Sequence, residues 1–460
     1  MTWSLVALFI FLALQLAIGI VVSRRIANEA DYLIGGRRLG YLLATASIFA
    51  TWFGAETMIG SAGEVYAGGL SLASAEPFGY ALCLILMGAF IARPLWERGL
   101  TTLADLYRQR FGVGTERLAA VILIPSSVLW AAAQVRAFGQ VIASTGPVPV
   151  EWAIGAAACF VIAYTAFGGL LADAVTDVLQ GVVLTIGLVV LLVAVVLAVG
   201  GPGAALTQLA TSERVDLAPT SSGPWLLTLE AWAIPVFGSL MATEVIGRVI
   251  GARSPQVAQR STLAAGALYL AIGLIPVVVA ILAAPLVGEM AHPEQFLPTV
   301  ARELLSPIGY ALFAGGLVSA ILSTVDSTLL VASGLFSHNL LVPLLKVTDE
   351  RRKLRYARLG VLLFGLIASV LALRATGVLA LVEQASAFGS AGVLVTSLFA
   401  LFTDIGSART AVITLLTGII VYLGALVAPL ETPFLLSLAA SLAAWGIGCI
   451  LDRARAPKAS

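Results

Sequence analysis

The chain has 460 residues, of which 60% are hydrophobic and only 11% are charged, and its formal net charge is +1. Its mean hydropathy is +1.01. A soluble globular protein carries about 25% charged residues because its surface faces water. The composition therefore excludes a soluble globular fold and predicts an all-α protein integral to the lipid bilayer, for which we expect no nucleic-acid partner.

Apolar stretches long enough to cross a bilayer recur along the whole chain. A span needs about 20 mainly apolar residues to cross about 30 Å of hydrocarbon. Polar residues, glycines and prolines divide these stretches into thirteen predicted membrane helices, at residues 3–23, 40–66, 70–92, 115–144, 149–167, 174–200, 224–250, 262–287, 307–343, 357–375, 378–403, 409–429 and 433–451. The run 307–343 is longer than one crossing needs, so we expect it to tilt strongly or to extend into the cytoplasm.

Lysine and arginine indicate the orientation, because cytoplasmic loops carry an excess of both. With thirteen spans and an outside N-terminus, nearly all of the 26 basic residues, Arg248 among them, fall in cytoplasmic segments. The C-terminus is then cytoplasmic. We expect a multi-pass protein of the plasma membrane, and the preference for arginine over lysine suggests a bacterial inner membrane.

Several ionisable residues fall within the predicted spans. Such groups cost a few kcal/mol at bilayer depth and therefore face a cavity or a partner. A channel would present rings of one charge, whereas scattered single acids beside glycine-broken helices are typical of a transporter. The ionisable residues are Glu56, Glu76, Arg136, Asp177, Glu230, Glu244, Asp326 and Glu383.

The second predicted helix contains Gly54, Gly60 and Gly63. Each glycine inside a helix costs about 1 kcal/mol relative to alanine. An unwound segment here would free main-chain carbonyls that a hard cation such as sodium binds. The glycines taken alone favour the alternative, which is close packing of helices through small residues.

The ninth predicted helix is rich in hydroxyl groups. Ser319, Ser323 and Ser327, with the adjacent Asp326, lie at helical spacing on one side. Together with carbonyls from a broken helix, these oxygens would surround a cation. The alternative is that the hydroxyls bond back to their own helix.

Three motifs along the chain resemble the sodium:solute symporter family. They are Ala50-Thr-Trp-Phe-Gly-Ala-Glu56, Gly168-Gly-Leu followed by Thr176-Asp-Val-Leu-Gln180, and Ala320-x-x-Ser323-Thr324. The resemblance covers essentially residues 1–450 and implies a LeuT-like fold of two inverted five-helix repeats. The implied divisions are an N-terminal extra helix and loop (1–39), the first repeat (40–200), an external loop (201–223), the second repeat (224–403), and two last helices with a short tail (404–460).

The resemblance also implies a sodium site between the first and eighth core helices. Its ligands would be the carbonyls of Ala50, Phe53 and Ala320 and the hydroxyls of Ser323 and Thr324.

Some members of the family hold a second sodium ion beside the aspartate that corresponds to Asp177. Asp326 and Ser327 occupy two of the later positions in the second-sodium pattern. Since Asp326 replaces a hydroxyl found in some members, the resemblance leaves open a second sodium ion or a proton here.

Within the family, the pattern is most similar to the choline-transporting branch. Trp52, Tyr80 and Trp130 correspond to aromatics of its choline pocket, and aromatic faces attract a quaternary ammonium. Glu56, Glu76 or Glu244 would add charge complementarity. The alternative role of the three aromatics is helix packing.

The sequence departs from the choline pattern at one position and shares a glutamate with another branch of the family. A further tryptophan of that cage is expected near Ala242, and Trp232 lies several residues earlier. Glu76 also matches a hydroxyl-binding glutamate of sugar-transporting members, so a sugar stays open.

The expected function is sodium-coupled import of a small organic solute by alternating access, with choline or betaine as the first candidate. A sugar, amino acid or carboxylate remains open as the solute, and a transporter-like membrane sensor remains open as the class. We expect no enzyme, because His292 and His338 belong to no metal-ligand spacing and no phosphate-binding glycine loop occurs. The oligomeric state is left open, and a monomer is compatible with the sequence.

Overall fold

A computed structural model describes residues 3–24, 26–144, 148–218, 224–290, 292–375 and 377–455. The first part of the chain forms α1 (Trp3–Ser23), α2 (Glu29–Ile34), η1 (Gly35–Arg37), α3 (Tyr41–Trp52), η2 (Glu56–Gly60), α4 (Ser61–Gly68), α5 (Phe78–Leu86), η3 (Met87–Ile91), α6 (Ala92–Glu97), α7 (Ala104–Phe111), α8 (Val113–Ser144), α9 (Val150–Ala198) and α10 (Pro202–Thr211). The second part forms α11 (Trp225–Ala233), η4 (Ile234–Gly238), α12 (Thr243–Gly251), α13 (Pro255–Ala283), η5 (Ala284–Leu286), η6 (Pro293–Gln295), α14 (Phe296–Leu304), α15 (Pro307–Gly334), η7 (Leu335–Leu341), α16 (Val342–Leu344), α17 (Glu350–Arg374), α18 (Val378–Ala387), α19 (Ser390–Phe402), α20 (Ala408–Val427) and α21 (Pro433–Arg455).

The helices of the described residues account for thirteen membrane crossings. Within the described residues, nine helical segments are long and apolar enough to cross a membrane, and two bent pairs raise the number to eleven. At 1.5 Å per residue, the 49 residues of α9 would extend about 74 Å, more than twice the hydrocarbon thickness. Gly169 breaks α9 with φ 63° and ψ 171°, so α9 crosses twice. The 21-residue α1 supplies the remaining crossing.

Three crossings are interrupted, which leaves main-chain groups available in the interior. The first, between α3 and η2, is bent by 55°, and the third, between α18 and α19, is bent by 41°. The second separates η4 from α12 at residues 239–242, next to a helical turn that contains Pro235. The sequence indicated a break in the second helix only, and there as one of two interpretations. The continuous helices expected at 224–250 and 378–403 are therefore corrected.

One other predicted boundary is wrong. The third membrane helix begins at Phe78 and not at residue 70, because Leu70–Ser71 forms β1 and pairs in parallel with β2 (Val215–Asp216). The predicted external loop 201–223 contains α10 as well as β2. The assignment of 40–200 and 224–403 as inverted repeats stays a prediction.

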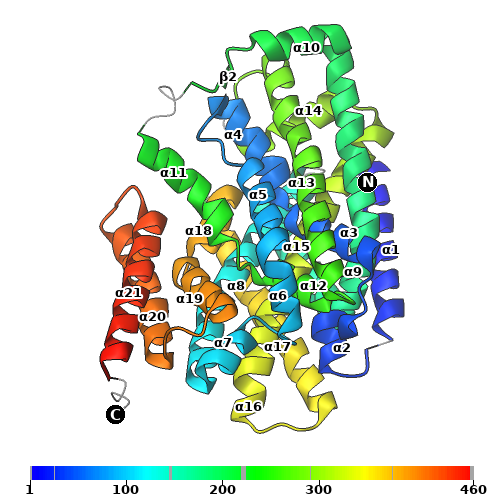
Figure 1. The fold of residues 1–460 in the computed structure, drawn as a ribbon. Helices are drawn as coiled ribbons and strands as arrows, with labels where there is room; N and C mark the ends of the chain where they lie inside the picture. Colours follow the sequence, from blue (N-terminus) through cyan, green and yellow to red (C-terminus); the bar gives the residue numbers. More distant parts are fainter. Residues whose placement is uncertain are drawn as a thin grey trace.

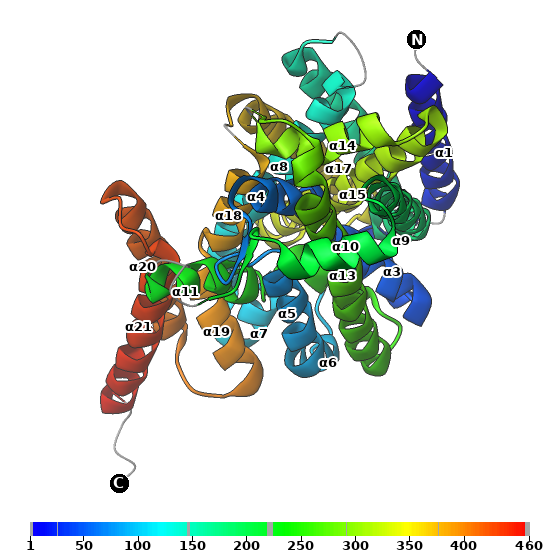
Figure 2. The same ribbon diagram turned by 90° about the horizontal axis from the view of Figure 1, so that it is seen from above.

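α15 forms the centre of the molecule and packs on α8, α9 and α3. Nearly every residue from Phe313 to Leu330 is buried. Viewed from above, α20 and α21 stand at one edge of the bundle and α1 stands on the other side (Figure 2). Large apolar side chains such as Leu42 and Val427 are 79% and 86% exposed on the outside. An outer surface of this kind suits lipid, because hydrocarbon solvates apolar side chains and water does not.

Candidate functional site

The end of α3 meets the middle of α15. The Thr324 hydroxyl donates to the main-chain carbonyl of Thr51 at 2.8 Å, and it also lies 3.1 Å from the carbonyl of Ala320. α3 ends at Trp52, with Phe53 as its C-cap, and the last carbonyls of a helix have no partner within it. The predicted sodium ligands Ala50, Phe53, Ala320, Ser323 and Thr324 are all at most 2% exposed.

This arrangement offers only oxygen atoms. Carbonyl oxygens come from the break after α3, hydroxyl oxygens come from Ser323 and Thr324, and the Ser323 hydroxyl donates to the carboxylate of Asp177. Oxygen atoms of this kind are the ligands that a hard cation prefers. The glycine-rich second helix is interrupted after Trp52, as one of the two sequence interpretations required.

A buried arginine lies close to these oxygens, on the other side of the Asp177 carboxylate. Arg248, on α12, is fully buried, and its Nη2 lies 2.6 Å from Asp173 Oδ2 and 3.3 Å from Asp177 Oδ2. Nη2 also donates to Ser327 Oγ at 2.5 Å, and Nε donates to Ser47 Oγ at 2.8 Å. A buried charge is stable when it is paired and hydrogen-bonded in this way.

The sequence did not predict this cluster. The distribution of basic residues placed Arg248 in a cytoplasmic segment, and the predicted spans 149–167 and 174–200 left Asp173 in the connection between them. The structure corrects both, because α12 packs inside against α3 and α15 and Asp173 lies within α9. The four-residue spacing between Asp173 and Asp177, which places both on one helix face, was the available signal.

The residues predicted for a second ion lie on two sides of this cluster. Ser327 contacts Arg248 and lies 3.3 Å from the Thr51 hydroxyl. Asp326 accepts from Thr165 at 2.8 Å through Oδ1, and its Oδ2 has no hydrogen-bond partner among the described residues. Asp326 and Asp173 line one small cavity. Ser319 bonds back to the carbonyl of Gly315 at 2.7 Å and does not join the site.

The three predicted aromatics form one cluster beside the break. The ring centroid of Trp52 lies 5.6 Å from that of Tyr80 and 5.5 Å from that of Trp130, and Tyr80 and Trp130 are 6.2 Å apart. Trp130 also borders a cavity of about 30 Å³ that Ala242 and Glu244 line, a space comparable with one water molecule. The three rings therefore pack directly on one another and leave little space between them.

The predicted acidic residues are held by hydrogen bonds around this cluster. Gln134 donates to Glu56 Oε2 at 2.9 Å, and Ser127 donates to Glu244 Oε1 at 2.8 Å. The Tyr269 hydroxyl donates to Glu76 Oε1 at 2.7 Å. Glu76 Oε2 has no partner among the described residues.

Three further polar residues of the spans have other roles. Trp232 stacks on Phe78 and donates to the carbonyl of Leu72, so it does not complete an aromatic cage. Glu230 accepts from the first amides of α21, those of Phe434 and Leu435. Arg136 donates to the carbonyl of Ala372. These contacts are structural.

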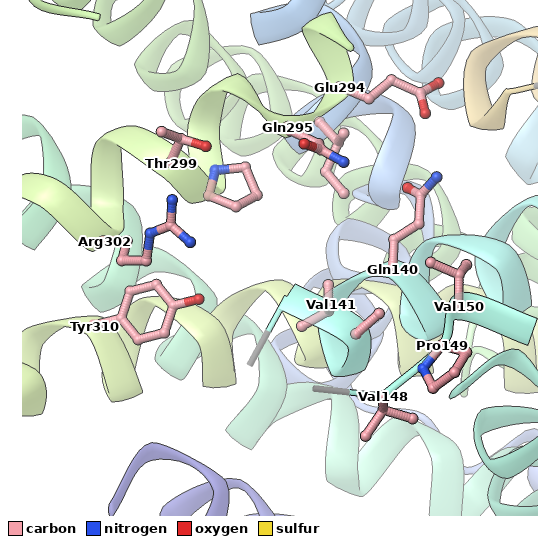
Figure 3. A pocket seen from close by; sticks show the side chains of 13 residues that line it. Gln140, Val141, Val148, Pro149, Val150, Glu294, Gln295, Thr299, Arg302 and Tyr310 are labelled. Atoms are coloured by element: carbon pink, nitrogen blue, oxygen red, sulfur yellow. The ribbon is translucent and has the colours of Figure 1, made fainter. Parts of the chain in front are cut away.

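α10 and α14 lie at one end of the molecule (Figure 1). A cavity of about 350 Å³ lies there, lined in part by α14 (Figure 3). Gln140, Glu294, Arg302 and Tyr310 surround it (Figure 3), and Ile59 of η2 forms part of its lining. The cavity therefore extends from the surface to the segment that follows the break in α3.

Polar contacts tie several helices together at the opposite end, near α2, α7 and α16 (Figure 1). His338 lies 3.1 Å from Glu29 and 3.5 Å from Asp105, and Asn339 donates to Asp105 and to Glu116. Burial alone would raise the pKa of the Asp105 carboxyl. Hydrogen bonds from His338 and from two main-chain amides outweigh burial and hold that pKa below its ordinary value.

Solved structures show the same fold. A Na⁺-coupled sialic acid symporter superposes with a TM-score of 0.87 at 20% identity, over 99% of this chain and 98% of that one. The nucleobase-cation-symport-1 family transporter Mhp1 gives 0.63 at 16% identity, over 93% and 95%. Both are transporters of LeuT-like fold, so the predicted fold class is confirmed.

Sequence relatives indicate the family to which the chain belongs. The chain is 30% identical to the Homo sapiens high affinity choline transporter 1, over 80% of this chain and 67% of that protein. It is 28% identical to the Haemophilus influenzae sodium/proline symporter, over 90% and 86%. The family model described as "Sodium:solute symporter family" matches residues 32–418. The chain, a multi-pass membrane protein, therefore belongs to the sodium:solute symporter family.

Proposed function

We propose that the protein imports a quaternary amine such as choline or betaine together with sodium, by alternating access. The proposal rests on the fact that two neighbouring residues, Thr51 and Trp52, belong to the two clusters. The carbonyl of Thr51 accepts from Thr324 in the oxygen site, and the next residue, Trp52, packs on Tyr80 and Trp130. Because neighbouring residues of one broken helix serve both clusters, an ion bound at the first shifts the aromatic faces of the second.

The proposed sodium ligands are the carbonyls of Ala50, Phe53 and Ala320 and the hydroxyls of Ser323 and Thr324. Thr324 donates its proton to a carbonyl of the broken helix, so its lone pairs remain free for a cation. A sodium ion between α3 and α15 would bind groups from both helices and hold them at one separation. Ion binding would thereby favour one state of the transport cycle.

The aromatic cluster is the proposed solute site. A cation binds an aromatic face within about 6 Å of the ring centroid, with about 0.5–2 kcal/mol for each ring. The rings of Trp52, Tyr80 and Trp130 now pack on one another, so the solute must separate them. Glu244 lines the same small cavity as Trp130, and Glu56 accepts from Gln134, one helical turn after Trp130. Either carboxylate would supply the opposite charge. The choline transporter relative supports the same solute class.

A hydroxyl-bearing solute such as a sugar is the second candidate. The observation in its favour is that the buried Oε2 of Glu76 has no hydrogen-bond partner within the part of the chain that the structure describes. A buried acceptor without a partner costs free energy that a solute hydroxyl would recover.

The cytoplasmic face is proposed to be the end with α2, α7 and α16. Arginines such as Arg37, Arg98 and Arg110 lie there, and cytoplasmic loops collect basic residues. The cavity beside α14 then opens to the outside, and import begins from it.

Thermal unfolding of the purified protein tests the function. The panel contains choline, betaine, a sugar and proline, each in sodium and in potassium. A ligand that binds the folded state raises its apparent stability by mass action. We expect choline or betaine to raise the Tm in sodium only. Stabilisation by the sugar alone would select the second candidate, and stabilisation that is equal in potassium would refute sodium coupling.

A further inference from the structure

We propose that the guanidinium of Arg248 is a tethered cation that takes the place of a second sodium ion, so that the protein moves one sodium ion with each solute. The inference rests on the proposed sodium coupling and deepens it, because it fixes the number of ions.

The oxygen atoms around Arg248 are those that a monovalent cation would use. Nη2 has three oxygen neighbours: Asp173 Oδ2 at 2.6 Å, Ser327 Oγ at 2.5 Å and Asp177 Oδ2 at 3.3 Å. Nε donates to the fourth, Ser47 Oγ, at 2.8 Å. Two carboxylates and two hydroxyls from three different helices thus converge on one positive group.

Arg248 contacts two of the residues that were predicted to bind a second ion. Asp177 and Ser327 were two of the three candidates, and Arg248 bonds to both. A sodium ion placed among the same oxygens would lie against the guanidinium and be repelled by it, strongly so in a buried site. Sodium and Arg248 therefore exclude each other from this position.

Ser323 connects the tethered cation to the proposed sodium site. Its hydroxyl donates to Asp177 Oδ1, while Asp177 Oδ2 faces Arg248. Asp177 thus lies between the fixed charge and the exchangeable one. Because Arg248 neutralises part of the acidic cluster permanently, the cluster needs no second dissociable ion in order to stay buried.

The wild-type protein gives the first test, and it needs no variant. Reconstituted in vesicles with fixed sodium and potassium gradients, it should show a Hill coefficient for sodium of about 1 and one sodium ion per solute, measured with radioactive sodium and solute. Two sodium ions per solute would overturn the tethered-cation proposal and leave sodium coupling intact. A protein that ignores sodium would overturn both, so the two failures are distinguishable.

Arg248→Ala gives the second test. It leaves Asp173, Asp177, Ser47 and Ser327 in place without their cation, and we expect the Hill coefficient to rise from about 1 to about 2. The variant should also unfold at a strongly sodium-dependent temperature. Arg248→Lys is the matched control, since it keeps a tethered positive charge and should retain one sodium ion. A folded Arg248→Ala protein that still binds a single sodium ion would overturn the proposal. If Arg248→Ala does not fold, the wild-type stoichiometry decides.

Discussion

The hydroxyl of Thr324 donates across 2.8 Å to the main-chain carbonyl of Thr51, a residue 273 positions earlier in the chain. The contact joins the central helix α15 to the broken end of α3. It also places a hydroxyl from the Ser323-Thr324 motif beside the carbonyls of the Ala50 motif, which is the pairing that the proposed sodium site requires.

Thr324→Ala removes one proposed sodium ligand. The loss of a hydrogen-bonding partner of a charged group costs about 1.5–3 kcal/mol, so the sodium concentration for half-maximal uptake should rise by about 10-fold or more. Thr328→Ala is the matched control, because the Thr328 hydroxyl is buried one turn later and, within the described residues, donates to the carbonyl of Val325 on its own helix. Sodium titrations of uptake that are alike for both variants would remove Thr324 from the ligand set.

Trp130→Leu removes one face of the aromatic cluster. At about 0.5–2 kcal/mol for each ring, the affinity for a quaternary amine should fall by about 2- to 30-fold, and Trp130→Phe should keep most of it. Trp232→Leu serves as the control, since that indole stacks on Phe78 away from the cluster. Binding of radioactive choline would report the difference. Equal loss in Trp130→Leu and Trp232→Leu would indicate a packing effect only.

Gly169→Ala tests the turn that divides α9. The positive φ of 63° is strained for alanine, and its Cβ would lie 2.8 Å from a ring carbon of Tyr32. We expect a lower Tm, with a loss of about 1–3 kcal/mol in stability. Gly155→Ala, in the same helix, has open space around the added Cβ and should be neutral. A Tm unchanged in both variants would show that the turn tolerates a side chain.

Asp105→Asn tests the polar contacts near α7. Because the pKa of the folded Asp105 carboxyl lies below its ordinary value, ionised Asp105 stabilises the fold above the unfolded pKa of about 3.9. That stability is lost only as the pH falls through the folded pKa. The variant should therefore unfold at a lower temperature than the wild type at about pH 7, and the gap should narrow below about pH 4. A gap that stays constant over this range would assign the effect to packing.

The sequence predicted the thirteen crossings from the lengths of its apolar runs. The resemblance to the symporter family, not a local pattern, implied that the Ala50 motif meets the Ser323-Thr324 motif, and the contact of Thr324 with the Thr51 carbonyl agrees with it. The sequence did not predict Arg248 in the interior. An arginine near the end of an apolar run looks interfacial. Its burial requires ion pairs with Asp173 and Asp177. Both aspartates follow the turn at Gly169 in α9, about 75 residues earlier in the chain, so no local pattern around Arg248 indicates them.

Breaks in the second half of the chain were missed for a related reason. Gly389 adopts φ 68° between α18 and α19, and residues 239–242 leave the helix although their sequence, Ser-Leu-Met-Ala, is compatible with one. Tertiary contacts override helix propensity at such positions.

The cavity beside α14 also shapes the electric field inside the protein. Water in a space of about 350 Å³ that reaches Ile59 carries the potential of the adjoining compartment inward, because water is far more polarisable than the packed helices below it. The membrane voltage then falls mainly across the protein layer between Ile59 and the end of the molecule that carries α2, α7 and α16. A cation that crosses this layer experiences most of the roughly 2.3 kcal/mol per 100 mV within a fraction of the bilayer thickness. If sodium binds at the proposed site, voltage acts most strongly on the step that moves it past the broken helix.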